Sequence, residues 1–357
     1  MALILNLLLT NIFLTGLCFL SLRYGRDQGT RWIDHLNRFI RIQAPSVLRR
    51  RIAKFFGQKA LQFIDSIISY VLYEKNPLTM ILYFVLCIGG YIAYIISVYP
   101  YLPNETITFP FHKQIGFLLF CLSLFFFLQS ASLNPGIITK ANHSQMMKIY
   151  PFDGVVFKSG NVCPTCCVEK PARSKHCRMT NFEIARFDHY CMYVKFFTFF
   201  RVHCVFRWIN QPMGLGNIKE FLLFLLFNNI MCLYGAYLGI GVLVNIVRAE
   251  NLTEAWFRDS YSGNRYKASP YYILIYLMGR ETLLVYMTIL LLVLGIFLLF
   301  FSYYHWVTLM RKGITTNEQE KLKHLTPSQR NRFLKLYSQN SWWQNFKHIW
   351  NQNCPQP

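Results

Sequence analysis

Five apolar stretches, each about 20 residues long, constrain this chain more than any other feature. An α-helix of about 20 residues crosses the ~30 Å hydrocarbon core of a bilayer. The composition agrees, because 54% of the 357 residues are hydrophobic and only 15% are charged, against about 25% in soluble domains. We therefore predict an all-α polytopic membrane protein. Its transmembrane helices, about five in number, are expected over residues 2–22, 79–99, 115–133, 221–247 and 283–303.

The basic residues are concentrated in alternate loops, and this pattern predicts the orientation of the chain. Segments 23–78, 134–220 and 304–357 carry eleven, twelve and eight Lys and Arg residues, whereas 100–114 carries one. The positive-inside rule places the three basic segments in the cytoplasm and the N-terminus outside. Charge on cytoplasmic faces near anionic lipid also accounts for the net charge of +21. No nucleic-acid-binding motif is present, so we expect the lipid bilayer and not nucleic acid as a partner.

The predicted spans divide the chain into six segments. The first stretch lacks a basic n-region and exceeds the usual length of a signal-peptide core, which favours an uncleaved anchor. Residues 23–75 space apolar side chains among Arg and Lys, as an amphipathic surface helix does. The segments are a membrane anchor (1–22), a basic cytoplasmic segment (23–78), a transmembrane hairpin (79–133), a cytoplasmic cysteine-rich domain (134–220), a second transmembrane hairpin (221–303) and a cytoplasmic tail (304–357).

Five of the eleven cysteines lie in the central loop, between positions 163 and 191. In a reducing compartment, such clusters more often bind metal or perform chemistry than form disulfides. Cys163 and Cys166 form a Cys-X-X-Cys pair, and His176-Cys177 follows after nine intervening residues, which is the spacing of a zinc knuckle. The loop also lacks the apolar periodicity of a self-sufficient core, and small segments of this kind usually need a metal. The sequence therefore predicts a zinc-stapled loop domain.

The same loop contains Asp188-His189-Tyr190-Cys191. A thiol two residues after a histidine, with an acid before it, is the minimum set of groups for a cysteine nucleophile. The histidine accepts the proton, and the carboxylate orients the ring and stabilises the imidazolium. We predict Cys191 as nucleophile, His189 as general base and Asp188 as its orienting partner. Their place between membrane spans narrows the substrates to those found at a bilayer surface.

Two longer stretches carry a family resemblance. Lys-Pro-Ala-Arg-Ser-Lys-His-Cys (170–177) and Arg-Phe-Asp-His-Tyr-Cys (186–191) resemble the DHHC-type protein S-acyltransferases, or palmitoyltransferases. Asn-Pro-Gly at 134–136, Gly-Leu-Gly-Asn at 214–217 and Thr-Thr-Asn-Glu at 315–318 are similar to further family motifs, in the family's order. The resemblance covers roughly residues 75–357. The extra N-terminal span resembles a branch of a family whose core has four spans.

The resemblance implies an enzyme that works in two steps. Cys191 would take the acyl chain from palmitoyl-CoA and pass it to a cysteine of a cytoplasmic or membrane protein. Thr316 would lie near the Asp188–His189 pair. The basic residues Lys170, Arg173 and Lys175 would face either the CoA phosphates or lipid head groups. By analogy with the family that it resembles, we expect the protein in the endoplasmic reticulum or the Golgi.

The chain departs from the family in its zinc ligands, of which the family has two sets. The first set maps to Cys163, Cys166, His176 and Glu183, where the glutamate replaces a cysteine but can still ligate zinc. The second set retains only Cys177. Its other positions hold Thr180, Tyr190 and either Phe197 or Pro212. We therefore expect one zinc site.

Residues 195–209 are an apolar and aromatic insertion relative to the family. They are a membrane-lying segment, or a source of replacement zinc ligands at His203 and Cys204, or else a retained intron or neutral loop expansion. We favour this last interpretation. His112 and His305 flank predicted spans and are expected at the membrane interface.

Three functions remain to be compared. We expect an active S-acyltransferase, and the alternative is an inactive membrane adaptor that retains the fold. The lost ligands favour the adaptor, because ~1 Å of misplacement can lower a rate a hundredfold, whereas the intact Asp188, His189 and Cys191 favour the enzyme. A transporter is set aside because the spans carry no ionisable residue near their centres.

Overall fold

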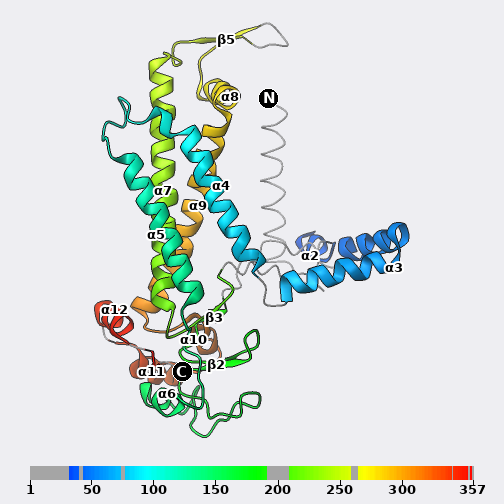
Figure 1. The fold of residues 1–357 in the computed structure, drawn as a ribbon, viewed down its shortest axis with the longest axis vertical. Coiled ribbons are helices and arrows are strands. Elements are labelled where there is room, and N and C mark those ends of the chain that lie inside the picture. The colour runs from blue at the N-terminus through cyan, green and yellow to red at the C-terminus, as the bar shows by residue number, and fades with distance from the viewer. Residues whose placement is uncertain are drawn as a thin grey trace. The chain divides into compact units, whose positions relative to one another are not determined.

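The computed structural model describes residues 32–39, 43–73, 77–190, 209–258, 264–339, 341–352 and 354–355. The chain divides into two compact units, residues 1–81 with 191–210 and residues 82–190 with 211–357. The elements (Figure 1) are α2 (Trp32–Arg38), α3 (Ala44–Tyr73), α4 (Leu78–Ser97), η2 (Tyr99–Tyr101), α5 (His112–Ser132), α6 (His143–Ile149), β1 (Lys175–Cys177), β2 (Phe182–Ile184), β3 (His189–Tyr190), β4 (Pro212–Met213), α7 (Ile218–Ala249), β5 (Trp256–Arg258), β6 (Arg265–Lys267), α8 (Pro270–Arg280), α9 (Thr282–Trp306), η4 (Val307–Arg311), α10 (Thr316–Leu322), α11 (Pro327–Tyr337) and α12 (Trp342–Asn351).

Within the described residues, four helical stretches are long and apolar enough to cross a membrane. They are Leu78–Tyr101, His112–Ser132, Ile218–Ala249 and Thr282–Arg311. Each overlaps one of the last four predicted spans, so the prediction of an all-α polytopic membrane protein is confirmed. The first predicted span, 2–22, lies outside the described residues, and the total of five stays a prediction.

The long helix α7 holds the bundle together by packing against α5 and α9. Small residues allow these backbones to approach closely: a Cβ on Gly239 would lie 2.2 Å from the Thr288 hydroxyl of α9. Asn229 of α7 donates from Nδ2 to the carbonyl of Gly295 on α9, at 2.7 Å. Close packing and interhelical hydrogen bonds of this kind are what hold helices together in lipid.

The first unit contains α3, which covers much of the predicted amphipathic segment. A kink at Gly57, where φ is 82°, interrupts the helix. Phe56 and Phe63 are exposed, and Arg49 pairs with Asp65 on the same helix. Exposed aromatic rings beside basic residues fit a helix that lies on a membrane surface, and this location stays a prediction.

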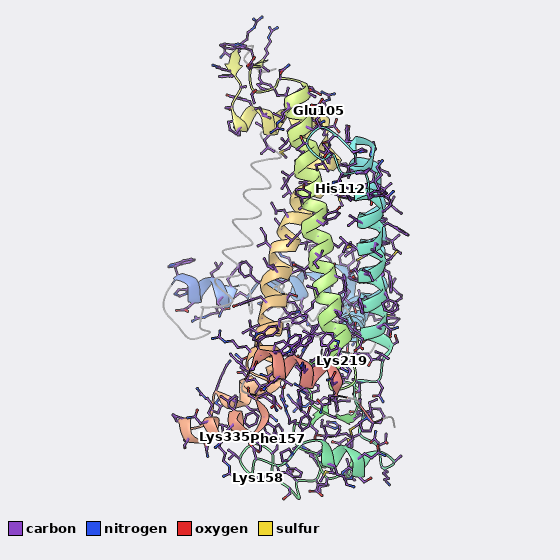
Figure 2. All side chains as sticks on the ribbon, turned by 90° about the vertical axis from the view of Figure 1, so that its left-hand side faces the viewer. Glu105, His112, Phe157, Lys158, Lys219 and Lys335 are labelled. Carbon is purple, nitrogen blue, oxygen red and sulfur yellow. The ribbon has the colours of Figure 1, made fainter. Side chains whose placement is uncertain are left out.

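The second unit has irregular structure at both ends of its helical bundle. Figure 2 shows Glu105 and His112 toward one end, and Phe157, Lys158 and Lys335 at the other. The cysteine-rich loop and the C-terminal helices α10 to α12 thus share one end, opposite β5 and α8 (Figure 1). The basic-residue pattern predicted this shared side. That the side is cytoplasmic stays a prediction.

The cysteine-rich loop shares a hydrophobic core with the C-terminal tail. Tyr150 and Phe157 of the loop pack with Phe333 and Tyr337 of α11, and the Tyr337 hydroxyl donates to the Pro151 carbonyl at 2.6 Å. The sequence indicated that the loop has no core of its own. The core is found between two segments that are more than 150 residues apart in sequence, so local periodicity does not reveal it.

Candidate active site and metal centre

Two glycine-containing motifs fix the cysteine-rich loop to the bundle. Asn134 Oδ1 accepts from the backbone N–H groups of Gly136 and Ile137 at 3.0 and 2.9 Å, which forms the turn after α5. Gly214 packs directly on this turn, because a Cβ there would lie 2.4 Å from the Pro135 carbonyl oxygen. Asn217 anchors the other side by donating to the Ser130 carbonyl at 3.2 Å. The Asn-Pro-Gly turn (134–136) and the Gly-Leu-Gly-Asn turn (214–217) therefore pack against each other at the end of α5.

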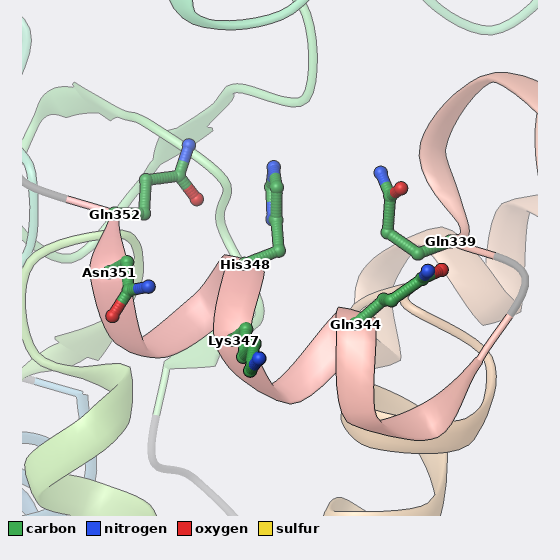
Figure 3. A pocket seen from close by; sticks show the side chains of 6 residues that line it. All are labelled: Gln339, Gln344, Lys347, His348, Asn351 and Gln352. Atoms are coloured by element: carbon green, nitrogen blue, oxygen red, sulfur yellow. The ribbon is translucent and has the colours of Figure 1, made fainter.

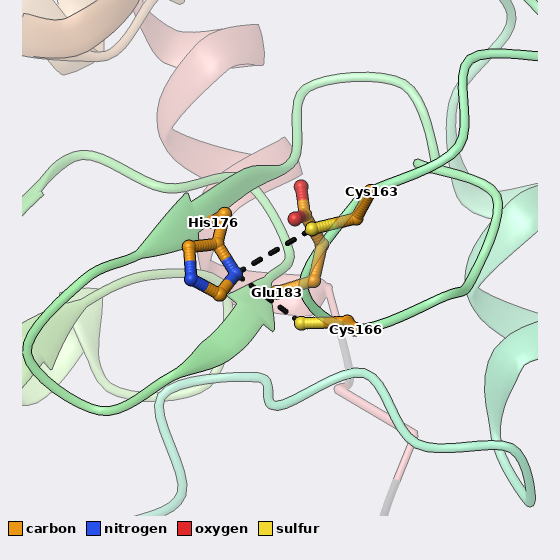
Figure 4. Close-up of side chains that lie close together, drawn as sticks. All are labelled: Cys163, Cys166, His176 and Glu183. Carbon is orange, nitrogen blue, oxygen red and sulfur yellow. Dashed lines mark hydrogen bonds between the residues drawn. The ribbon is translucent and has the colours of Figure 1, made fainter.

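The four residues expected at the first zinc site come together in the structure. Their ligand atoms, from Cys163, Cys166, His176 and Glu183, all lie within 4.8 Å of one another. His176 Nδ1 lies 3.5 Å from Cys163 Sγ and 3.2 Å from Cys166 Sγ (Figure 4). His176 and Glu183 are directly opposite each other across the β1–β2 pair. The two thiols come from a tight turn in which the Cys167 N–H donates to the Cys163 carbonyl at 2.8 Å.

The donor set fits a zinc ion. Thiolate, imidazole and carboxylate are zinc's usual ligands, and four of them make a closed structural site. Glu183 is fully buried, and its Oε2 has no hydrogen-bond partner among the described residues, while Oε1 accepts from Ser174 Oγ at 2.8 Å. A buried carboxylate oxygen without a partner is unfavourable unless a cation compensates it. Zinc bound here would tie the Cys163 turn to the β1–β2 pair.

Cys177 does not join this group. It is buried at the end of β1, and no cluster of three metal-ligating side chains in the described part of the chain includes it. Adjacent strand residues point to opposite faces, so Cys177 faces away from His176. Its assignment as a metal ligand stays a prediction that the geometry does not support. Thr180 and Tyr190 offer no substitute ligands for a second site.

Removing the Glu183 charge should weaken zinc binding while the rest of the loop is retained. We expect about one zinc per wild-type chain, and an affinity about tenfold lower or weaker still in Glu183→Gln, measured by elemental analysis after dialysis against graded chelator. Glu169→Gln is the matched control, because Glu169 lies in the same loop and bonds the Gly160 N–H. Equal zinc retention in both variants would exclude Glu183 as a ligand.

Asp188 and His189 form a hydrogen-bonded pair at the start of β3. The His189 Nδ1–H donates to Asp188 Oδ2 at 2.7 Å. The β3–β4 pairing sets His189 opposite Met213, and the Asp188 N–H donates to the Met213 carbonyl at 2.9 Å. Asp188 is fully buried. Burial alone would raise the pKa of its carboxyl, but the His189 ring, with smaller contributions from His305 and the Thr316 backbone N–H, holds that pKa well below its usual range.

The Thr-Thr-Asn-Glu motif after α9 donates hydrogen bonds to Asp188 and to the residue before it. The Thr316 backbone N–H donates to Asp188 Oδ1, and Thr315 Oγ1 donates to the Phe187 carbonyl at 3.1 Å. Thr315 and Glu318 also form a capping box at the start of α10. The expected proximity of Thr316 to Asp188 is confirmed, and the contact is made by its backbone.

Arg173 occupies a different place from the one expected. Its side chain is fully buried and makes a bidentate pair with Glu318, with Nε and Nη2 each 2.6 Å from a carboxylate oxygen. The guanidinium also lies against the rings of Tyr150 and Tyr337, at 4.8 and 5.0 Å from their centroids. A buried cation already neutralised in this way is not available to a phosphate in solvent. The structure therefore corrects this assignment: Arg173 links the cysteine-rich loop to the motif that clamps Asp188.

The two lysines remain accessible. Lys175 is exposed, and its Nζ donates to Asn317 Oδ1 at 2.9 Å. Lys170 is half-buried. Cys191, directly after β3, lies outside the described residues, as do residues 195–208 of the insertion with His203 and Cys204.

His305 is a residue whose contacts sequence reasoning missed. Its expected location at the membrane interface stays a prediction, and its side chain is buried at the end of α9 with Nδ1 3.7 Å from Asp188 Oδ2. Asp188, His189 and His305 form the second group of potential metal-ligating atoms in the described residues. Its position just before the Thr-Thr-Asn-Glu motif was the available signal, since that motif is expected near Asp188.

A polar pocket of about 420 Å³ opens along α12 (Figure 3). Its six lining residues are Gln339, Gln344, Lys347, His348, Asn351 and Gln352. Burial, together with the charges of Arg186 and Arg173, lowers the pKa of His348 to about 4, so the ring is neutral at pH 7. Gln352 Oε1 accepts from Tyr150 and Arg186 at 2.6 and 3.3 Å. The lining consists of four side-chain amides, one lysine and one histidine, and it contains no thiol or hydroxyl.

Comparisons with known proteins identify relatives of this chain. The family model described as DHHC palmitoyltransferase matches residues 156–206 and 195–323. Palmitoyltransferase swf1 of Schizosaccharomyces pombe is 30% identical over 309 residues, which cover 86% of this chain and 77% of that protein. Palmitoyltransferase ZDHHC4 of Mus musculus is 29% identical over 196 residues, and palmitoyltransferase SWF1 of Yarrowia lipolytica is 30% identical over 207. These two alignments cover 55% and 58% of this chain and about half of each relative, 52% and 49%.

Proposed function

Because this chain belongs to the DHHC palmitoyltransferase family of protein S-acyltransferases, we propose that Cys191 receives a palmitoyl group from palmitoyl-CoA and transfers it to cysteines of target proteins. The observation that carries this proposal is the buried Asp188–His189 pair two residues before the thiol. The Asp188 hydrogen bond occupies His189 Nδ1, which leaves Nε2 as the nitrogen that accepts a proton.

In the first step, His189 Nε2 takes the proton of Cys191, and the thiolate attacks the thioester carbonyl of the acyl-CoA. A new sulfur–carbon bond forms on Cys191 as the bond to the CoA sulfur breaks, and His189 returns its proton to the departing CoA thiolate. Asp188 stabilises the imidazolium between these two transfers. Because the pKa of Asp188 is depressed, the carboxylate stays ionised throughout the neutral range.

In the second step, the acceptor cysteine of a target protein replaces CoA. His189 takes its proton, the acceptor thiolate attacks the acyl group on Cys191, and the released Cys191 thiolate recovers the proton. Cys163, Cys166, His176 and Glu183 would hold a zinc ion, which would make the loop rigid. A palmitoyl chain is favoured within the apolar bundle by ~0.8 kcal/mol per buried methylene.

We assign the contacts with the CoA phosphates to Lys170 and Lys175, and leave Arg173 out because its charge is neutralised by Glu318. Since the catalytic loop has to meet cytoplasmic acyl-CoA, we place this end of the bundle and the C-terminus in the cytoplasm. The basic loops support the same orientation. The endoplasmic reticulum or the Golgi is the proposed compartment.

The inactive adaptor is the less supported alternative. It was motivated by the lost zinc ligands, but four ligand atoms still converge in the first site. The Asp188–His189 pair is also formed. The relatives described above bear palmitoyltransferase names, and none of these findings favours the adaptor.

Autoacylation tests the proposal. The detergent-purified full chain is incubated with an alkyne-tagged palmitoyl-CoA, and bound label is measured before and after hydroxylamine, which cleaves thioesters. We expect hydroxylamine-labile label on the wild type and only background on Cys191→Ser. Cys167→Ser is the matched control, because Cys167 is an exposed thiol of the same loop. Equal labelling of wild type and Cys191→Ser would refute Cys191 as the acyl carrier and leave the adaptor.

A further inference from the structure

The end of α9 brings a buried histidine to the Asp188–His189 pair. His305 is 3% exposed. Its ring centroid lies 5.1 Å from that of His189, and the Phe221 ring contacts both, at 5.2 Å from His189 and 5.3 Å from His305. The three rings thus contact one another, and His189 is held between a ring from α7 and a ring from α9. None of the steps described above uses His305.

The polar edge of His305 faces a single carboxylate oxygen. Its Nδ1 is buried, lies 3.7 Å from Asp188 Oδ2, and finds no hydrogen-bond partner elsewhere in the described part of the chain. An unsatisfied buried nitrogen is unfavourable, and the other rings around His305 are the aromatic Phe221, Phe301 and Tyr304. A phenyl ring would fill this space without the penalty. The nitrogen therefore points to a polar function directed at Asp188.

The two carboxylate oxygens of Asp188 accept hydrogen bonds from different kinds of donor. Oδ1 accepts from the fixed Thr316 backbone N–H, whereas Oδ2 accepts from the His189 ring, the group that gains and loses a proton during the reaction. Any rotation of His189 toward its substrates would leave Oδ2 without a donor in a fully buried site. His305 Nδ1 needs to approach by less than 1 Å to form that hydrogen bond.

We propose that His305 is a positioning residue for acyl transfer, whose Nδ1–H is the second donor to Asp188 Oδ2. By holding this carboxylate in place it keeps His189 aligned through both steps. The inference rests on the proposed function only in taking His189 as the base that activates Cys191. It assigns to the last transmembrane helix a direct part in aligning the catalytic pair.

Two substitutions separate the polar role from simple packing. His305→Phe keeps a ring against His189 and Phe221 but removes the donor. His305→Asn removes the ring but places an amide N–H where Nδ1 stood. The first readout is the rate of Cys191 alkylation by iodoacetamide at pH 7, followed by peptide mass spectrometry. This rate reports the thiolate and needs no acyl-CoA. The second readout is kcat and KM for palmitoyl-CoA. Zinc content and the thermal midpoint check the fold.

We expect His305→Phe to lower both the alkylation rate and kcat about tenfold, the effect of one hydrogen bond to a charged group, with KM within about twofold of wild type. His305→Asn should retain most of both rates. If His305→Phe has wild-type rates and His305→Asn has lowered rates, only the packing of the ring matters and the proposal is overturned. Wild-type rates in both variants would also overturn it. If wild type forms no acyl-enzyme, the proposed function fails, while the alkylation rates still decide the role of His305.

Discussion

Asp188→Asn is expected to abolish acyl-enzyme formation almost completely while leaving the chain folded. The amide has the shape of the carboxylate, so the contact with the Thr316 N–H can persist. It cannot stabilise an imidazolium at His189, and it no longer favours the tautomer that leaves Nε2 free. The corresponding change in other acid–histidine–nucleophile sites lowers kcat on the order of 10⁴-fold. The measurement is single-turnover labelling by palmitoyl-CoA.

Asp65→Asn is the matched control, because Asp65 is an aspartate outside the site that pairs with Arg49 on α3. It should label at the wild-type rate. A loss of less than about tenfold in Asp188→Asn would contradict the assigned role, since the carboxylate would then contribute little to the barrier.

The depressed pKa of Asp188 also fixes the pH dependence of the site. The native carboxyl has a lower pKa than the ~3.9 of an unfolded chain. Its contribution to stability is therefore fully present above that value and is lost as pH falls through the lower native pKa. Asp188→Asn should accordingly lower the free energy of unfolding at neutral pH. That free energy should then fall less than in the wild type when the pH is lowered.

Glu318→Ala is expected to have the largest effect on stability. It leaves the buried Arg173 guanidinium without its counter-ion and removes the capping box of α10. Breaking one partner of a buried ion pair lowers the free energy of unfolding by about 3–5 kcal/mol. The measurement is the thermal midpoint in detergent, followed by the fraction of chain that remains soluble and monodisperse after heating. Acyl-enzyme formation should fall with it, because Thr316 then no longer holds Asp188.

Glu320→Ala is the matched control for this variant. Glu320 lies two residues further along α10 and pairs with Lys323 at the exposed surface, where ion pairs contribute little. We expect an unchanged midpoint. Replacing both partners by apolar residues, as in Arg173→Met with Glu318→Leu, should recover much of the stability of Glu318→Ala. If Glu318→Ala melts like Glu320→Ala, the buried pair does not link the loop to the tail.

The sequence predicted the elements whose signals are local. The four later spans are runs of apolar residues, and each matches a helix in the structure. Three members of the candidate metal site, Cys163, Cys166 and His176, follow from local spacing, and Glu183 follows from the family resemblance. The β1–β2 pair that joins His176 to Glu183 needs only a short turn. The Asp188–His189 pair consists of neighbours in the chain, so its hydrogen bond needs little tertiary information.

The sequence erred where a side chain's surroundings come from distant segments. Arg173 lies in a basic stretch and was expected to face either CoA phosphates or lipid head groups, yet it pairs with Glu318, 145 residues away. His305 lies at the end of a span, and its position against Asp188 was not foreseen. No local pattern distinguishes a solvent-facing arginine from one that meets a buried carboxylate, because the difference in free energy depends on which segments pack together.

By itself, then, the sequence determined the membrane class and supplied the candidate metal ligands and catalytic residues, since hydrophobic length and ligand spacing are encoded over a few to about 20 residues. Tertiary structure alone decided how the site is held. The loop after α5, the turn before α7 and the motif after α9 converge on Asp188, and they bring the Thr316 N–H and the His305 ring with them. These contacts form only when the bundle closes, because close packing of α7 on α5 and α9 brings those helix ends together.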